Sequence, residues 1–404
     1  MSEEGRTCPE ISKTNTKIKA FETLFDYCLK IFVIVSTFFY LPIAPNADLF
    51  KIQEWGYMTQ ELFFRYGIVF LFALSIFMRP RRELISKTLG ALLVYLIFSG
   101  IFITFDLQYR RAVLNLFLGL IFYKLVAERI DLDSLKKYSF WIFSLIYANF
   151  VLCIFQLFDK DPIFSMTNRS MFPSFEICGF MKLKATLGGL AAVTAPFLTL
   201  ISPWGWIIAA PLIYFSKASS AALAFVLSMG FILYFRVKRA IFWAASSLLA
   251  LAGGVYIVFY DLPTGQFNQR LIIWHRTISE VLRNSPFFGF GMGKFAAWQP
   301  QTAQLTHKDL LTWIWAHNEF VQLLFEGGLI ALIFILIFFR QRIIDFRRFY
   351  MNRDLQVLFA SVISISIISF FNFPFHIARM SGICIFLIAA YHAKVIELEK
   401  FHEH

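Results

Sequence analysis

Residues 329–339 read LIALIFILIFF, and residues 317–328 immediately before them read HNEFVQLLFEGG. Together they are long and apolar enough to cross roughly 30 Å of hydrocarbon, which takes about 20 helical residues. The span nevertheless opens with a histidine, an asparagine and a glutamate, and carries Glu326 in its third turn. Because ionisable residues in a membrane are costly, they usually face the bundle interior and mark a functional path. The stretch therefore predicts a membrane helix whose first residues belong to a functional site.

The composition of the whole chain favours a bilayer as its solvent. Of 404 residues, 58% are hydrophobic, 51 are phenylalanine and 16% are charged, which would leave a soluble protein with large exposed apolar patches. We predict an all-α polytopic membrane protein with about twelve transmembrane helices. The predicted spans are residues 22–42, 62–78, 86–105, 112–127, 138–158, 183–200, 204–216, 219–235, 240–260, 318–339, 355–373 and 380–396.

The charge distribution predicts the orientation of these spans. The net charge is +12, and positive residues gather in cytoplasmic loops. With a cytoplasmic N-terminus, the cation-rich segments 79–83, 128–137, 236–239 and 340–353 all lie inside. The excess of positive charge is therefore explained by the cytoplasmic loops, and no nucleic-acid partner is expected. The predicted parts are a cytoplasmic tail (1–21), nine spans (22–260), a large external loop domain (261–317), three spans (318–396) and a second cytoplasmic tail (397–404).

The external loop is expected to fold into two or three helices. Its segment RLIIWHRTISEVLRN, residues 270–284, has helical spacing and precedes the glycine-rich SPFFGFGMGKF. The glycines follow no strand, so that a tight turn explains them better than a nucleotide site. The five cysteines lie far apart without metal-ligand spacing, and no metal or cofactor is expected.

Under this topology, functional side chains from distant segments reach the level of His317 at the outer boundary of the membrane. They are Arg270 and Arg276 from the external loop, Lys217 from a short turn, His376 and Arg379 from the last outer turn, and Arg169, Lys182 and Lys184 from residues 159–184. Such cations suit an anion such as a lipid-linked diphosphate, because a guanidinium binds two phosphate oxygens at once. A histidine that is neutral near pH 7 can accept a proton from an attacking hydroxyl.

Each of these residues also has a simpler interpretation. His317 could be a hydrogen-bonding group at a helix end, and Arg270 a solvated loop charge. Arg379 could be a snorkelling anchor, and Lys217 a cap at the end of its short helix. Glu326 lies too deep to be a surface charge, and we expect it to pair with a cation or a backbone donor inside the bundle.

Three segments in this order and spacing resemble the O-antigen ligase and polymerase superfamily. They are RLIIW at 270–274, NSPFFGFGMGKF at 284–295 and HNEFVQLLFEGG at 317–328. The most specific part is the HN pair followed by Gly327 and Gly328. The resemblance covers the twelve-span layout and is strongest over residues 265–330.

The resemblance implies a GT-C-like membrane glycosyltransferase. It would move an O-antigen glycan from undecaprenyl diphosphate to a sugar of lipid A–core at the periplasmic face of the bacterial inner membrane, with inversion and without metal or nucleotide hydrolysis. His317 matches the essential histidine of the family and would be the general base, and Arg270 matches the essential arginine. Trp274 belongs to the same motif, and Asn318 would orient the imidazole or a sugar hydroxyl.

The chain departs from the family pattern in one segment. Where a Ser-Arg pair is common, residues 216–223 read SKASSAAL, so the cationic role passes to Lys217, or to Lys184 if the alignment shifts.

Other functions stay open at this point. An O-antigen polymerase would use a lipid-linked repeat unit as acceptor, and a protein-directed oligosaccharyltransferase usually has a longer C-terminal part. A transporter or flippase of an anionic lipid-linked glycan would need polar residues through the midplane. Here the polar groups cluster at one boundary, and the inner halves of the spans are mostly Phe, Leu and Ile.

Overall fold

The structure is a computed structural model, and every regular element in the part that it describes is a helix. The described residues are 9–37, 49–78, 90–92, 94–97, 107–158, 177, 179–181, 184–240, 242–243, 264–306 and 314–402, without the side chains of 9–18, 49–60, 107–109, 264–267, 305–306 and 378–379. Five described helices are long and apolar enough to cross a membrane. The prediction of an all-α polytopic membrane protein is confirmed, whereas the number of twelve spans stays a prediction.

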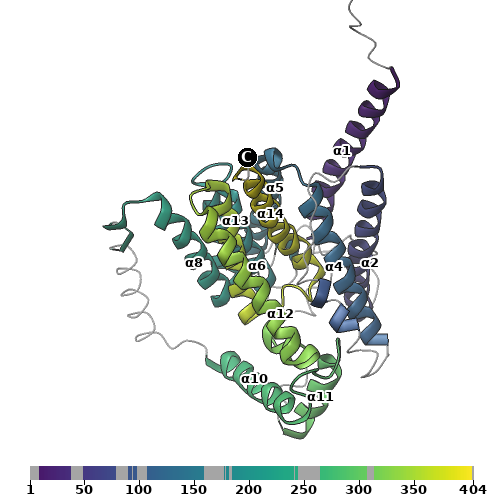
Figure 1. The fold of residues 1–404 in the computed structure, drawn as a ribbon. Helices are drawn as coiled ribbons and strands as arrows, with labels where there is room; N and C mark the ends of the chain where they lie inside the picture. The colour runs from purple at the N-terminus through teal and green to yellow at the C-terminus, as the bar shows by residue number, and fades with distance from the viewer. Residues whose placement is uncertain are drawn as a thin grey trace, which may run out of the picture.

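The long helices form one bundle around a shared apolar core (Figure 1). Helix α13 lies inside it, packed against α6, α8 and α14. The bundle helices are α1 (Pro9–Val35), α2 (Leu49–Ile76), α4 (Leu107–Arg129), α5 (Leu135–Leu157), α6 (Lys184–Leu198), α7 (Ala209–Ser216), α8 (Ser219–Arg236), α12 (Glu319–Phe349), α13 (Arg353–Phe371) and α14 (Ala378–His402). Short 3-10 turns at Leu132–Ser134, Gly179–Met181 and Gly205–Ile208 precede α5, α6 and α7.

Several helices extend beyond the predicted spans. Helix α12 continues through most of the predicted cytoplasmic loop 340–353 and ends at Phe349. In this extension Arg342 and Asp345, one turn apart, form an ion pair at 3.0 Å. Likewise α1 begins at Pro9, ahead of the predicted first span, and α2 begins at Leu49, inside a predicted outer segment. Hydropathy locates the part of a helix inside hydrocarbon, whereas the helix ends where its backbone hydrogen bonds end.

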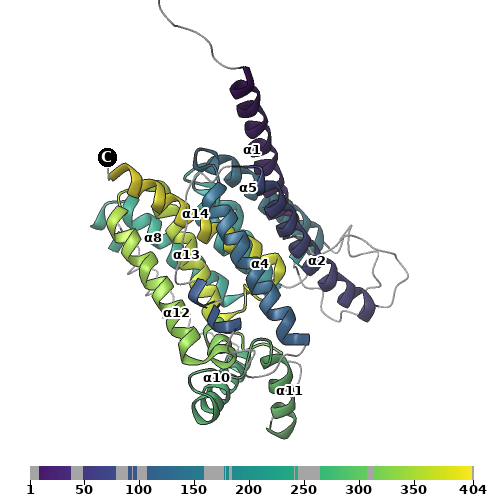
Figure 2. The ribbon, with the colours of Figure 1, turned by 45° about the vertical axis from the view of Figure 1, so that its right-hand side comes forward.

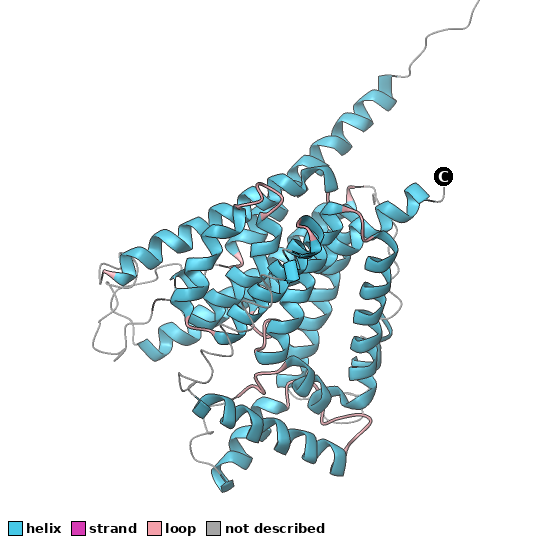
Figure 3. Ribbon diagram, turned by 90° about the vertical axis from the view of Figure 1, so that its left-hand side faces the viewer, coloured by secondary structure: helices cyan, strands magenta, loops and turns pink. Residues whose placement is uncertain are grey.

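Two helices occupy the predicted external loop, at the end of the bundle away from the C-terminus (Figures 2 and 3). They are α10 (Thr264–Asn284) and α11 (Phe295–Thr306). Helix α10 buries Ile273, Thr277 and Val281, whose spacing places them on one face. Ile273 and Val281 belong to a second apolar core that also includes Phe325 of α12. The external helices and the first turns of α12 are therefore packed as one unit.

Helix α12 is interrupted at Gly328, whose φ of 66° and ψ of −170° are not helical. The glycine-rich segment 285–294 fills the interruption. Phe290 N–H donates to Phe325 O at 2.8 Å and Gly291 N–H to Glu326 O at 2.9 Å, while Leu329 N–H donates to Pro286 O at 2.9 Å. Backbone groups released by the break are thus satisfied by a neighbouring segment, as burial requires.

Candidate functional site

His317 lies between the external helices and α12, in a left-handed backbone conformation with φ of 52°. Among the described residues, only His317 and Lys217 combine a side chain with a positive φ. The next residue, Asn318, begins α12: its Oδ1 accepts from the N–H groups of Phe320 and Val321 at 2.9 and 3.1 Å. An unfavourable backbone conformation that is retained beside a rigid cap is typical of functional positions.

Arg270 reaches from α10 to the end of α13, where its Nη1 donates to Phe371 O at 2.9 Å. Its Nε is buried and has no hydrogen-bond partner among the described residues. Burial lowers the pKa of Arg270, so the site holds a partly desolvated cation. One turn further along α10, Trp274 Nε1 donates to Ala316 O at 2.8 Å, next to His317.

The α13–α14 loop, residues 372–377, joins these groups. The ring of Phe373 packs edge-on against His317, with centroids 4.7 Å apart, and stacks on Trp315. Arg270 and His317, which are 47 positions apart in the chain, therefore contact Phe371 and Phe373, two positions apart at the end of α13 and the start of the loop. Burial, followed by the nearby charge of Arg270, lowers the pKa of His317 to about 3. His317 is accordingly neutral at physiological pH.

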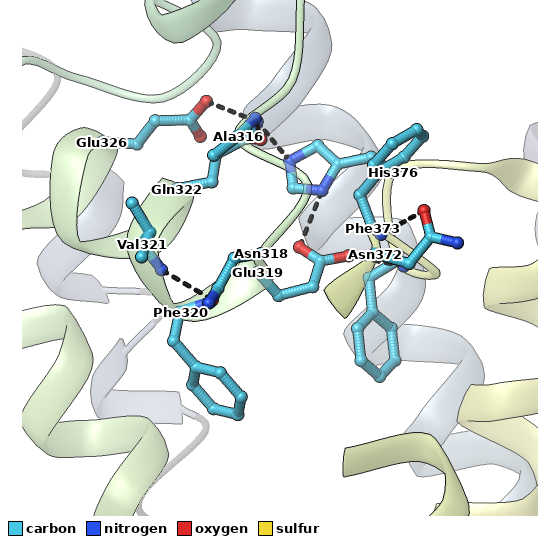
Figure 4. Close-up of polar contacts among 11 residues, drawn as sticks. Ala316, Asn318, Glu319, Phe320, Val321, Gln322, Glu326, Asn372, Phe373 and His376 are labelled. Atoms are coloured by element: carbon cyan, nitrogen blue, oxygen red, sulfur yellow. Dashed lines mark hydrogen bonds and ion pairs between the residues drawn. The ribbon is translucent and has the colours of Figure 1, made fainter. Parts of the chain in front are cut away.

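A chain of polar side chains links the first turns of α12 to His376 of the α13–α14 loop (Figure 4). Glu319 Oε2 and His376 Nδ1 are 2.8 Å apart, and Glu319 Oε1 accepts from Phe375 N–H at 2.8 Å. On the other side of the ring, Gln322 Nε2 lies 3.0 Å from His376 Nε2 and donates to Glu326 Oε1 at 3.1 Å. Glu326 is 2% exposed and accepts a further bond from the backbone of Gly293. The prediction that Glu326 pairs with a buried backbone donor is confirmed.

The proton on His376 is placed by its neighbours. Ala316 N–H donates to Gln322 Oε1 at 3.2 Å, which turns the amide nitrogen of Gln322 toward His376. That nitrogen can donate to Nε2 only in the neutral ring whose single proton lies on Nδ1, facing Glu319. Burial lowers the pKa of His376, but Glu319 and then Glu326 raise it more, to about 9. At neutral pH the ring therefore favours a second proton, on Nε2, and Nε2 would then donate to the carboxamide oxygen of Gln322 instead of accepting from its nitrogen.

Two predicted cations lie at the same end of the bundle. Lys217 is exposed and ends α7 in a left-handed conformation, so the interpretation as a helix cap is correct for its backbone. The end of α7 contacts the start of α6, since a Cβ on Gly188 would overlap the side chain of Ser216. Lys184 begins α6. A small cavity separates this region from the α13–α14 loop, lined by Ala185, Thr186, Gly189, Ile368, Asn372, Pro374, Ile377 and Met380.

The other predicted site residues are placed less directly. Asn318 is buried and its carboxamide oxygen is used by the helix cap. Arg276 is six residues after Arg270, about 240° around the helix, and so lies on another face of α10. Burial lowers its pKa. Arg169 and Lys182 lie outside the described residues, as does the side chain of Arg379, which is on the first turn of α14.

The sequence interpretation missed Gln322 and Phe373. Phe373 is one of 51 phenylalanines, and nothing in the sequence distinguishes it. Gln322 has a recognisable signal: it lies three residues after Glu319 and four before Glu326, a spacing that puts all three on one helix face. An uncharged amide in an apolar run is easily overlooked, although burial makes it as dependent on partners as a charge.

One comparison with known proteins found a match that includes part of this site. The family model described as O-antigen ligase matches residues 204–336, which include α7, α8, α10, α11 and the first part of α12. The comparison with curated proteins gives no match. The matched region contains Lys217, Arg270, Trp274 and His317. This part of the chain, 133 of its 404 residues, is therefore similar to the O-antigen ligase family.

Proposed function

We propose that the protein is an O-antigen ligase of the bacterial inner membrane. It would transfer a glycan from undecaprenyl diphosphate to a sugar of lipid A–core, with α10, α11 and the site facing the periplasm. The observation that carries this proposal is the approach of Arg270 and His317 to the same end of α13. A desolvated cation next to a neutral imidazole suits a reaction with an anionic leaving group and a hydroxyl nucleophile.

His317 is the proposed general base. Its ring takes the proton of the acceptor hydroxyl while the hydroxyl oxygen attacks the anomeric carbon of the donor. The bond from that carbon to the diphosphate oxygen breaks, both electrons stay on the oxygen, and attack from the opposite face inverts the anomeric centre. In the free site Arg270 depresses the pKa of His317. A bound diphosphate would offset that charge and make the imidazole a stronger base when the donor is present.

Arg270 is the proposed partner of the leaving diphosphate. Its Nη1 is fixed by Phe371 O, while its Nε is buried and has no hydrogen-bond partner among the described residues. A preorganised donor of this kind stabilises the negative charge that develops on the leaving oxygen, and its removal lowers the rate on the order of 100- to 1,000-fold. Lys217 and Lys184, at the same end of the bundle, would provide the outer part of the diphosphate site.

The test is reconstitution in detergent with two substrates, undecaprenyl diphosphate-linked glycan and lipid A–core. The product is read from the mobility of the lipopolysaccharide on a gel. We expect His317→Ala and Arg270→Ala to abolish detectable transfer, because each removes a group that acts on the reacting atoms. His275→Ala and Arg283→Ala are the matched controls, since both residues are exposed on α10.

The same assay separates the alternatives. A polymerase would lengthen the lipid-linked glycan without lipid A–core, and a transporter would form no covalent product. Full transfer by purified His317→Ala would remove the general-base assignment.

A further inference from the structure

Three side chains on one face of α12, Glu319, Gln322 and Glu326, are left without a role by this mechanism. Glu319 and Gln322 contact His376 of the α13–α14 loop, and Glu326 accepts a hydrogen bond from Gln322 (Figure 4). Gln322 and Glu326 are 1% and 2% exposed. Burying carboxylates and an amide costs free energy unless each finds partners, and packed apolar side chains would hold two segments together without that cost. Holding the two segments together does not by itself explain the cluster, which indicates a role that needs defined hydrogen bonds.

The cluster fixes the α13–α14 loop in two directions. Glu319 holds it through the Phe375 N–H and through His376 Nδ1, at 2.8 Å in each case. Gln322 holds the other ring nitrogen of His376 at 3.0 Å. Hydrogen bonds require defined distances and angles, so a ring held at both nitrogens cannot rotate, and the loop cannot slide along α12.

The same loop supports both groups assigned to the reaction. Phe373 packs against the His317 ring, and Phe371 O, at the preceding end of α13, accepts from Arg270. The cluster also reaches the backbone beside His317, since Gln322 Oε1 accepts from Ala316 N–H at 3.2 Å. A displacement of His376 would thus be transmitted to His317 from two sides, through Phe373 and through Ala316.

We propose that His376, held between Glu319 and Gln322, is a positioning residue that sets the placement of His317 relative to Arg270. It does not contact the substrates. It keeps the α13–α14 loop in register with α12, and the inference rests on the proposed function for the roles of His317 and Arg270. Misplacement of reacting groups by about 1 Å can lower a rate about 100-fold.

The experiment compares His376→Phe, His376→Asn and Glu319→Gln in the two-substrate transfer assay. Phenylalanine fills the space without either hydrogen bond, and we expect kcat to fall about 100-fold, with KM for lipid A–core changed less than about threefold. Asparagine keeps an N–H close to the position of Nδ1, so the kcat of His376→Asn should be at least about tenfold higher than that of His376→Phe. Glu399→Gln is the matched control, because it removes one carboxylate charge from an exposed ion pair with Arg348 at the other end of the bundle.

Hydrogen–deuterium exchange of the peptide covering residues 370–377 is measured on the same proteins, because it needs no substrate. Glu319→Gln and His376→Phe should both exchange faster than wild type at Phe375, whose N–H donates to Glu319. If His376→Phe does not fold, the kinetics and exchange of His376→Asn and Glu319→Gln decide the question.

The possible results are distinct. Reduced kcat with partial recovery by asparagine and faster exchange supports the positioning role. Wild-type kcat in folded His376→Phe overturns it, even if His317→Ala is inactive and the proposed function stands. If wild type forms no product while the exchange of the loop responds as expected, the proposed function fails and the coupling of loop to cluster is retained. Unchanged exchange in all three variants rejects the coupling itself.

Discussion

Replacing Gly328 with alanine should separate the glycine-rich segment from α12. Gly328 has φ of 66° and ψ of −170°, a region that only glycine occupies without strain. A Cβ at this position would overlap the carbonyl of Phe287 and lie 2.6 Å from Phe288 N. Both are backbone atoms, so no side-chain rotation can relieve the contact. The segment would have to move away, and Leu329 N–H and Ile330 N–H would lose their acceptors, Pro286 O and Phe287 O.

The expected cost follows from these contacts. The backbone conformation costs a non-glycine residue about 1–3 kcal/mol, and each lost hydrogen bond adds about 1 kcal/mol. We therefore expect Gly328→Ala to lower the free energy of unfolding by roughly 3–5 kcal/mol. Transfer activity should fall as well, because the displaced segment also binds Glu326 through the Gly293 backbone.

The assay is thermal unfolding in detergent, followed by tryptophan fluorescence, with a midpoint expected roughly 5 °C or more below wild type. Gly230→Ala is the matched control. A Cβ at Gly230, inside α8, meets nothing within 4 Å, and alanine in a helix interior should stabilise by about 0.5–1 kcal/mol. A Gly328→Ala protein with the wild-type midpoint and wild-type transfer would refute the reasoning, because the break would then tolerate a side chain.

Two further predictions concern the first turn of α12 and the charge of His317. Asn318→Ala should lower the free energy of unfolding by about 1 kcal/mol and also reduce transfer. The control, Asn352→Ala, removes the cap of α13 and should lower stability alone. Both variants are measured by thermal unfolding and by the gel assay, and equal transfer by the two would contradict the link between the α12 cap and the site. The pKa of His317 is depressed to about 3, so its neutral form persists as pH falls. The value of kcat/KM should therefore stay level from about pH 7 to pH 5, where a general-base histidine with an ordinary pKa would lose more than about tenfold; a decline in wild type over this range would reject the depressed pKa.

The sequence predicted the part of the site that depends on topology. His317 and Arg270 come from segments that flank one external loop, and residues at the same membrane boundary are brought to a common level by the spans alone. Hydropathy also predicted spans that coincide with α5, α8, α12, α13 and α14, the five described helices that are long and apolar enough to cross a membrane. The helical nature of the chain and the approach of distant polar groups at one end of the bundle therefore needed no tertiary information.

The remainder depends on tertiary contacts. The pair Gly327-Gly328 is visible in the sequence, but the break at Gly328 is decided by the segment around Phe287 and Gly289 that packs into it. Likewise, two cations at the same depth in the membrane can extend from different sides of their helix. Arg270 faces α13, whereas Arg276 lies about 240° further around α10. Sequence position gives the height of a side chain in the membrane, and the packing of its helix gives the side on which it acts.

The interruption of α12 also decides which parts of the protein can change position together. Before Gly328 the helix shares an apolar core with α10 and α11, and beyond it residues such as Phe338 and Phe346 belong to the bundle core. His317 and Arg270 lie with the first of these parts, and both contact the second at the end of α13 and the loop after it. A tilt of the first part about Gly328 would therefore be felt first at two contacts, the bond from Arg270 to Phe371 O and the packing of Phe373 on His317.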